Sequence, residues 1–195
     1  NNENSAPIAN HATYTVDEDN SITIYLSASD IDGDVLNFSI TDFPSNGFVT
    51  QSGGIVTYTP NVNFNGIDTF TFIASDGQSN SNDGTINLIV NAVNDAPYLY
   101  PLDDIQIFSG EPFVYELYAV DVDGDELIYT ATASNSTASI TVIDNILTIM
   151  SSQANITFSI TVTVSDGSAT SSSEFILTVI ESESCEEEYS QGFLD

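Results

Sequence analysis

Lysine and arginine are absent from this chain, whereas aspartate and glutamate together number 29, so the formal net charge at pH 7 is −29. Without cationic side chains the chain cannot neutralise phosphates or release their counterions, and we exclude nucleic acid as a partner. Attraction to anionic membrane surfaces is excluded for the same reason. The acidic groups must therefore be solvated, hydrogen-bonded to backbone N–H groups or bound to cations.

Cysteine and long apolar runs are also scarce. The single Cys185 rules out an internal disulfide framework. No apolar run approaches the roughly 20 residues of a membrane span, so we expect no membrane insertion. The chain starts at Asn1 without an initiator methionine or signal-like segment, and we expect a mature form or an excised fragment. No nucleophile–base set or phosphate-binding glycine loop is recognisable, and we expect no enzymatic activity.

Three markers recur at almost one spacing along the chain. Ala6-Pro7 returns as Ala96-Pro97, which is 96 − 6 = 90 positions later. The Asp-rich segment 30–34 returns at 121–125, a shift of 91, and Ser-Asp-Gly at 75–77 returns at 165–167, a shift of 90. The chain is therefore predicted to hold two copies of one domain of about 90 residues.

Short segments of β-branched and aromatic residues, separated by turn residues, predict seven strands in each copy. No window shows convincing helical periodicity. The first seven are expected at Ala12–Val16, Ser21–Ala28, Val35–Ile40, Gly47–Thr50, Ile55–Thr59, Asp68–Ala74 and Thr85–Val90. The second seven are expected at Ile105–Phe108, Phe113–Val120, Leu127–Ala133, Ser139–Val142, Ile146–Met150, Thr157–Val164 and Glu174–Ile180.

This spacing predicts an all-β chain of two tandem Greek-key, seven-stranded β-sandwiches of immunoglobulin-like size. The expected divisions are 1–10 as a linker or strand, 11–95 and 96–180 as the two sandwiches, and 181–195 as an acidic tail. The tail is interpreted as solvated, because it has little to bury.

The first copy resembles the cadherin-like repeats of bacterial and archaeal surface proteins. The segments that carry the resemblance are Tyr58-Thr59-Pro60, Asn63-Phe64-Asn65-Gly66, Asp68-Thr69-Phe70-Thr71-Phe72 and the linker Asn94-Asp95-Ala96-Pro97. The second copy keeps the Asp-rich loop and Ser165-Asp166-Gly167 but lacks an Asn-Phe-Asn-Gly segment. It is more similar to the dystroglycan-type cadherin-like or immunoglobulin-like repeats.

Because successive strands of such a sandwich alternate in direction, its loops divide between two poles. Acidic residues of the first copy (Asp17, Glu18, Asp19, Asp68) and the linker residues Asn94 and Asp95 are expected at the C-terminal pole of that copy. Asp121, Asp123, Asp125 and Asp166 are expected at the N-terminal pole of the second. So many carboxylates need a cation between them. A set of six to eight oxygen ligands suits Ca²⁺ better than Mg²⁺.

The resemblance implies the same ion, because cadherins hold Ca²⁺ between successive repeats with the corresponding acids. It assigns ligand roles to Glu18, Asp68, Asn94, Asp95, Asp121, Asp123 and Asp166. A further Ca²⁺ site is expected at the N-terminal pole of the first copy, from Asp30, Asp32, Asp34 and Asp76 with residues 1–7 or a preceding repeat. The alternative left open is that these Asp side chains only cap tight turns.

The predicted function is an extracellular, cell-surface structural or adhesion module in which Ca²⁺ at the joint stiffens a tandem rod. Its expected partners are neighbouring repeats or subunits, or a cell-surface protein or glycan. One alternative is a filament subunit that polymerises head to tail by strand addition, through segments such as 1–10 or 181–195. Another is a carbohydrate-binding module, for which nine tyrosines could supply stacking surfaces.

Overall fold

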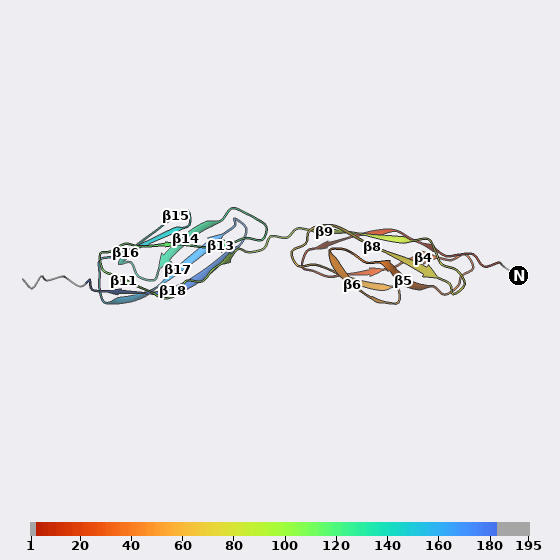
Figure 1. The fold of residues 1–195 in the computed structure, drawn as a ribbon, viewed down its shortest axis with the longest axis horizontal. Helices are drawn as coiled ribbons and strands as arrows, with labels where there is room; N and C mark the ends of the chain where they lie inside the picture. The colour runs from red at the N-terminus through yellow and green to blue at the C-terminus, as the bar shows by residue number, and fades with distance from the viewer. Residues whose placement is uncertain (1–2, 183–195) are drawn as a thin grey trace, which may run out of the picture. The chain divides into compact units, whose positions relative to one another are not determined.

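The computed structural model describes residues 3–182 and divides the chain into two compact units, Asn1–Val93 and Asn94–Asp195. We call the described parts of these units module one and module two. All regular secondary structure between residues 3 and 182 is β-strand, as the sequence predicts (Figure 1). None of these residues forms a helix that could cross a membrane. The expectations for Cys185 and most of the acidic tail lie outside the described residues.

Module one is a sandwich of a four-stranded and a three-stranded sheet. The first has the order β2-β9-β8-β5 and the second β3-β7-β6, while β1 pairs with β4 alone. Its strands are β1 (Ile8–Ala9), β2 (Ala12–Asp17), β3 (Ile22–Tyr25), β4 (Ala28–Ser29), β5 (Asn37–Asp42), β6 (Gly47–Ser52), β7 (Ile55–Pro60), β8 (Gly66–Ser75) and β9 (Gly84–Asn91).

Module two repeats this plan, with sheets β11-β18-β17-β14 and β12-β16-β15 and the short pair β10-β13. Its strands are β10 (Tyr98–Leu99), β11 (Ile105–Phe108), β12 (Phe113–Glu116), β13 (Ala119–Val120), β14 (Ile128–Ala133), β15 (Ala138–Ile143), β16 (Ile146–Ser151), β17 (Ile156–Ser165) and β18 (Thr170–Ile180). In each module the two shortest strands are continuations of the first and second strands, so the predicted fold of seven strands per copy is confirmed.

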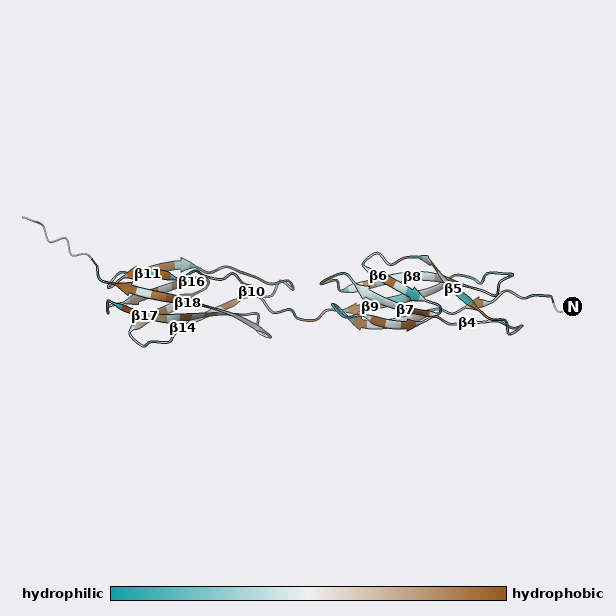
Figure 2. Cartoon of the chain, turned by 90° about the horizontal axis from the view of Figure 1, so that it is seen from below, coloured by the Kyte–Doolittle hydropathy of each residue, from teal (hydrophilic) through white to brown (hydrophobic). Residues whose placement is uncertain are grey.

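The cores form because alternate residues of each strand point into the sandwich. Along β17, Phe158, Ile160, Val162 and Val164 are buried, while the serine and threonine residues between them face outward. Figure 2 shows this alternation of hydrophobic and hydrophilic residues along the strands. In module one Phe70, Phe72 and Leu88 are fully buried in the same way. Each such side chain stabilises its module by about 1.5–3 kcal/mol.

Two expected strands are broken in the structure. The sequence predicts Ser21–Ala28 as one strand, but β3 pairs with β7 in the three-stranded sheet and β4 pairs with β1 in a separate two-stranded sheet. The predicted strand Phe113–Val120 divides in the same way into β12 and β13. In both cases the chain leaves one sheet and pairs with a different strand. The local alternation of hydrophobic and polar residues does not reveal such a change of partner.

Candidate metal centre

The loop 121–125 joins β13 to β14 and is closed by the side chain of Asp121. Its Oδ1 accepts hydrogen bonds from the backbone N–H groups of Asp123 and Gly124, both at 3.0 Å, and of Asp125 at 3.2 Å. Gly124 has a φ of +81°, a conformation that other residues adopt with strain. The expected turn-capping role is therefore present, and it uses one carboxylate oxygen of Asp121.

The corresponding loop of module one has the same construction. Asp30 Oδ1 accepts from the backbone N–H groups of Asp32, Gly33 and Asp34 at 2.8, 3.0 and 3.4 Å. Gly33 has a φ of +80°. The other oxygen, Oδ2, is buried in both Asp30 and Asp121 and has no hydrogen-bond partner. A buried carboxylate oxygen without a donor is unfavourable, so these two atoms call for a cation or an ordered water.

A second loop places one more carboxylate at the same pole of each module. Asp166 Oδ1 accepts from the N–H groups of Ser168 and Ala169, both at 2.6 Å. These bonds, that of Ala169 most of all, together with the Asn94 side chain, lower the pKa of Asp166. Asp76 is held in the same way by Gln78 and Ser79, and Asn4 contributes most to lowering its pKa. Both carboxylates are thus held ionised.

The segment before each Ala-Pro pair is hydrogen-bonded to the acidic loops of its module. Asn94 Nδ2 donates to Asp166 Oδ2 at 2.9 Å, and the N–H of Asp95 donates to Asp123 Oδ2 at 2.8 Å. In module one Asn4 Nδ2 donates to Asp76 Oδ2 at 2.9 Å, and the N–H of Ser5 donates to Asp32 Oδ2 at 2.8 Å. Asn4 and Ser5 lie in the range 1–7 that the sequence offers for this site, but no sequence motif singles them out. Carrying the 90-residue repeat two positions before Ala6-Pro7 would have aligned Asn4 with Asn94.

The module-two acidic site consists of Asn94, Asp95, Asp121, Asp123, Asp125 and Asp166. The module-one acidic site consists of Asn4, Asp30, Asp32, Asp34 and Asp76.

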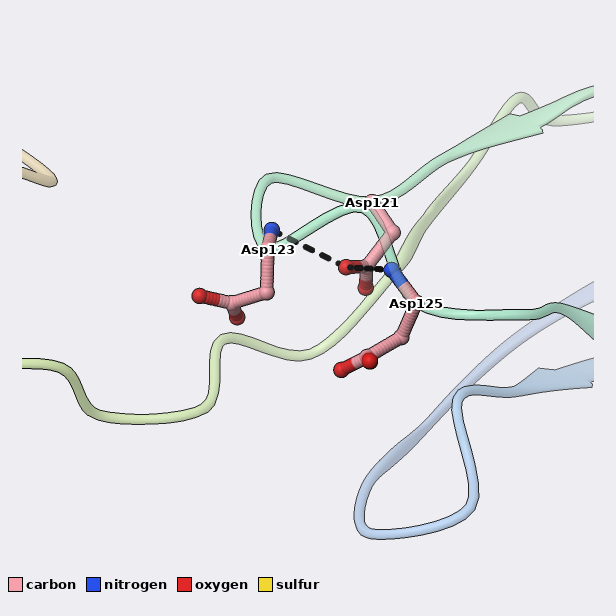
Figure 3. Close-up of side chains that lie close together, drawn as sticks. All are labelled: Asp121, Asp123 and Asp125. Atoms are coloured by element: carbon pink, nitrogen blue, oxygen red, sulfur yellow. Dashed lines mark hydrogen bonds between the residues drawn. The ribbon is translucent and has the colours of Figure 1, made fainter.

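Within the module-two acidic site, Asp121, Asp123 and Asp125 lie closest together. Each offers one carboxylate oxygen, and these oxygens all lie within 4.8 Å of one another. Figure 3 shows the three side chains on the loop, with Asp121 hydrogen-bonded to the backbone N–H groups of Asp123 and Asp125. In residues 3–182 no other such group of three occurs. In module one, Asp32 and Asp34 instead line a polar cleft together with Glu3, Asn4 and Gln78.

The donor set of the module-two acidic site fits Ca²⁺. The ion binds oxygen ligands at 2.3–2.6 Å, so two ligands on opposite sides of it lie at most about 5 Å apart. The 4.8 Å limit on the three oxygens meets this requirement. All its side chains present carboxylate or amide oxygens, the ligands of a hard cation. The buried Oδ2 of Asp121 is the atom that most needs a positive partner.

Asp68 has a different environment from the other predicted ligands. It is 4% exposed and accepts four hydrogen bonds inside module one. The donors are the N–H groups of Ser45 (3.0 Å), Asn46 (2.9 Å) and Thr69 (2.9 Å) and the hydroxyl of Tyr58 (2.9 Å). Burial and the neighbouring carboxylate raise the pKa of Tyr58 and keep its hydroxyl protonated. Because these donors occupy both oxygens, we leave Asp68 out of the proposed site.

Glu18 is also buried, at 3% exposed. Its Oε1 accepts from the N–H of Val93 at 2.7 Å, and its Oε2 has a long contact of 3.5 Å with Asn65 Nδ2. Asp19 Oδ1 accepts a hydrogen bond from the backbone N–H of Asn63, so the loop after β2 contacts the loop between β7 and β8. Glu18 thus holds the last residue of module one, and its role as a ligand stays a prediction.

Two segments of the chain match the same known protein family. Residues 4–89 and 94–178 each match the family described as the bacterial Ig domain. The chain belongs to this family. It holds two tandem copies, so the resemblance to immunoglobulin-like repeats is confirmed, and the resemblance to cadherin-like repeats is confirmed for the fold.

Similar proteins include two from Dictyostelium discoideum. Integrin beta-like protein B is 29% identical over 118 residues, and integrin beta-like protein C is 32% identical over 114 residues. The matches cover 52% and 49% of this chain and only 6% of each relative. Among solved structures, human protocadherin-24 EC1-2 has a TM-score of 0.59 at 16% identity, covering 91% of this chain and 100% of that one. This likeness shows the fold alone.

Proposed function

We propose that this chain is an extracellular, cell-surface structural or adhesion module that binds Ca²⁺ at its acidic sites. The observation that carries the proposal is the buried Oδ2 of Asp121, which has no donor and lies in a loop where three carboxylates converge within 4.8 Å. The same unpartnered oxygen recurs at Asp30 in the other module. With no lysine or arginine in the chain, a cation from solution is the available counter-charge.

In module two the ion would be held by oxygens of Asp121, Asp123, Asp125 and Asp166, with Asn94 and Asp95 from the linker. In module one Asp30, Asp32, Asp34 and Asp76 would serve. Bound Ca²⁺ supplies positive charge to carboxylates that otherwise repel one another. Extracellular Ca²⁺ modules typically bind at roughly 10⁻⁴–10⁻³ M, and we expect both sites in that range.

The hydrogen bonds on either side of the linker support a stiffening role. Val93 is bonded to Glu18 of module one, whereas Asn94 and Asp95 are bonded to module two. An ion that ligates Asn94 or Asp95 would strengthen the second attachment. We therefore propose that Ca²⁺ limits bending of the chain at residues 93–95, as a spacing or adhesion module requires.

The test is isothermal calorimetry of Ca²⁺ binding to the chain and to the variant D121N/D123N. We expect Ca²⁺ at the module-two acidic site to bind at least about tenfold more weakly in the variant, because the substitutions remove two charged ligands. The control D103N/E174Q removes the same number of charges at exposed positions outside the site and should bind normally. Equal weakening in both variants would show nonspecific attraction and contradict the proposal.

The filament and carbohydrate alternatives are not favoured by a specific contact. Residues 8–9 pair with Ala28–Ser29 of their own module, so this part of the segment 1–10 is not available for strand addition. The other segment considered for strand addition, 181–195, lies almost wholly outside the described residues. Both alternatives stay predictions.

A further inference from the structure

Three tyrosines of module two form a continuous exposed surface, which we call the tyrosine platform: Tyr98, Tyr100 and Tyr118. Their exposed fractions are 57%, 45% and 61%. The rings of Tyr98 and Tyr100 meet edge to face with centroids 5.0 Å apart, and those of Tyr100 and Tyr118 are 4.9 Å apart. These rings contact one another, yet each leaves a large part of its surface to solvent.

The backbone beneath the platform is fixed by pairing. Tyr98 lies opposite Val120, and the N–H of Tyr100 donates to the carbonyl of Tyr118 at 3.0 Å. Leu99, between the first two tyrosines, is buried in the core of module two. The alternation turns Tyr98 and Tyr100 outward together, so the rings stand on a part of the fold that is anchored to the core.

Module one shows that the fold does not need aromatic residues here. Asn10 and Ser27 occupy the positions of Tyr100 and Tyr118, and the same backbone bond joins them, at 2.9 Å. Their side chains are also bonded, from Asn10 Nδ2 to Ser27 Oγ at 3.0 Å. A polar pair thus closes this corner in one module, whereas three aromatic rings occupy it in the other. Exposed rings of this kind, grouped together, mark an interaction surface.

Charge decides what can cover the platform. Val120 is followed directly by Asp121, and Tyr98 lies three positions after Asp95, so both strands of the platform lead into the module-two acidic site. An acidic partner or a second copy of this chain would bring further negative charge to this surface, and the chain has no lysine or arginine to compensate it. Tyrosine ring faces carry negative electrostatic potential and attract arginine and lysine side chains.

We infer that the tyrosine platform binds a basic segment of a partner protein, with arginine or lysine side chains lying on the ring faces. The acidic residues around it would attract the segment over a longer range and speed association. The rings would then provide the short-range, specific contact. This inference does not rest on the proposed Ca²⁺ binding, because the ring contacts and the backbone hydrogen bond of the platform involve no residue of the module-two acidic site.

The test uses a short peptide of alternating arginine and glycine, titrated into the isotope-labelled chain in EGTA at about 0.15 M salt, where long-range attraction is screened. A matched peptide with uncharged citrulline in place of arginine measures the part of the binding that does not require positive charge on the peptide. The variant Y100N/Y118S carries the residues of module one and leaves the charge unchanged. The control Y25S removes a single exposed tyrosine of module one.

We expect the arginine peptide to shift the amide signals of residues 98–100 and 118–120, and the citrulline peptide not to. Affinity should fall roughly tenfold in Y100N/Y118S and stay unchanged in Y25S. The variant Y98S, with a smaller loss, provides a second reading if the double variant unfolds. Equal affinity in all variants would show binding by charge alone and overturn the inference. Shifts at the platform with a neutral oligosaccharide but not with the arginine peptide would also overturn it.

Discussion

The carboxylate of Asp68 lies among four hydrogen-bond donors of module one, three of them from the backbone and one from Tyr58. Its counterpart 90 positions later is Phe158, so module two has no such group. A carboxylate that ties a turn to two strands in the interior is a structural residue. The carboxylates of the acidic sites, by contrast, lie in loops at one pole of each module.

Replacing Asp68 with asparagine should therefore destabilise module one strongly. The amide can accept hydrogen bonds at only one atom and brings two donors toward N–H groups that are already donors. We expect a loss of about 3 kcal/mol or more in the free energy of unfolding, measured by urea denaturation. Y58F, which removes a single bond, should lose about 1–2 kcal/mol. If D68N were as stable as the parent chain, the assigned structural role would be wrong.

The Asn4 side chain is predicted to control the ionisation of Asp76. It is the largest cause of the lowered pKa of Asp76, so N4A should raise that pKa toward its usual 3.8. Carboxyl NMR titration in EGTA would measure the change. Asp166 serves as the control, because it lies in the other module and its pKa is lowered chiefly by the N–H of Ala169. A pKa of Asp76 unaffected by N4A would contradict this assignment.

The sign of the accompanying stability effect is fixed by linkage. Because the folded-state pKa values of Asp76 and Asp166 lie below the usual 3.8, these groups stabilise the fold at pH values above 3.8. That contribution is lost as the pH falls through the folded-state values. The contribution of these two groups to stability should therefore decline as the pH falls below about 3.8, and N4A should remove part of that decline in module one.

At the scale of the strands, Gly84, the first residue of β9, occupies a position with no room for a side chain. A Cβ atom there would lie 2.5 Å from the ring of Phe72 and 3.1 Å from Cβ of Ala9. G84A should destabilise module one by about 1–3 kcal/mol through overpacking. N87A, at an exposed position of the same strand, should have little effect. Thermal unfolding compares the two, and equal melting temperatures for G84A and the parent chain would contradict the close contact.

The strands also show what the sequence can and cannot predict. Long alternating segments such as β17 and β8 were predicted within two residues at each end, because their buried positions repeat with a period of two. The pairs β1-β4 and β10-β13 were not recognised, since two-residue strands have no periodicity. Of the site, the aspartates could be predicted from the repeat. Asn4 could have been found by extending the same repeat two positions before Ala6-Pro7. The structural role of Asp68 depends on contacts over up to 23 residues, which local patterns do not contain.

At the scale of the whole molecule, the dominant property is a charge of −29 without any lysine or arginine. Carboxylates in such a chain can be stabilised by solvent, by backbone N–H groups and by cations. The structure shows stabilisation by backbone N–H groups at Asp30, Asp121, Asp76 and Asp166. Stabilisation by a bound cation is what we propose. Any salt screens the general repulsion, whereas a specific site distinguishes Ca²⁺ from other divalent ions.

Thermal unfolding of residues 1–195 in EGTA, in Mg²⁺ and in Ca²⁺ at equal ionic strength tests this claim most directly. An ion at a free concentration of about ten times its dissociation constant stabilises the folded module that binds it by about 1.4 kcal/mol. This raises the melting temperature of a domain of this size by roughly 5–10 °C. We predict that rise in millimolar Ca²⁺ and a much smaller one in Mg²⁺. Equal rises in the two ions, or none in either, would show that the acidic loops are only capped turns and contradict the account.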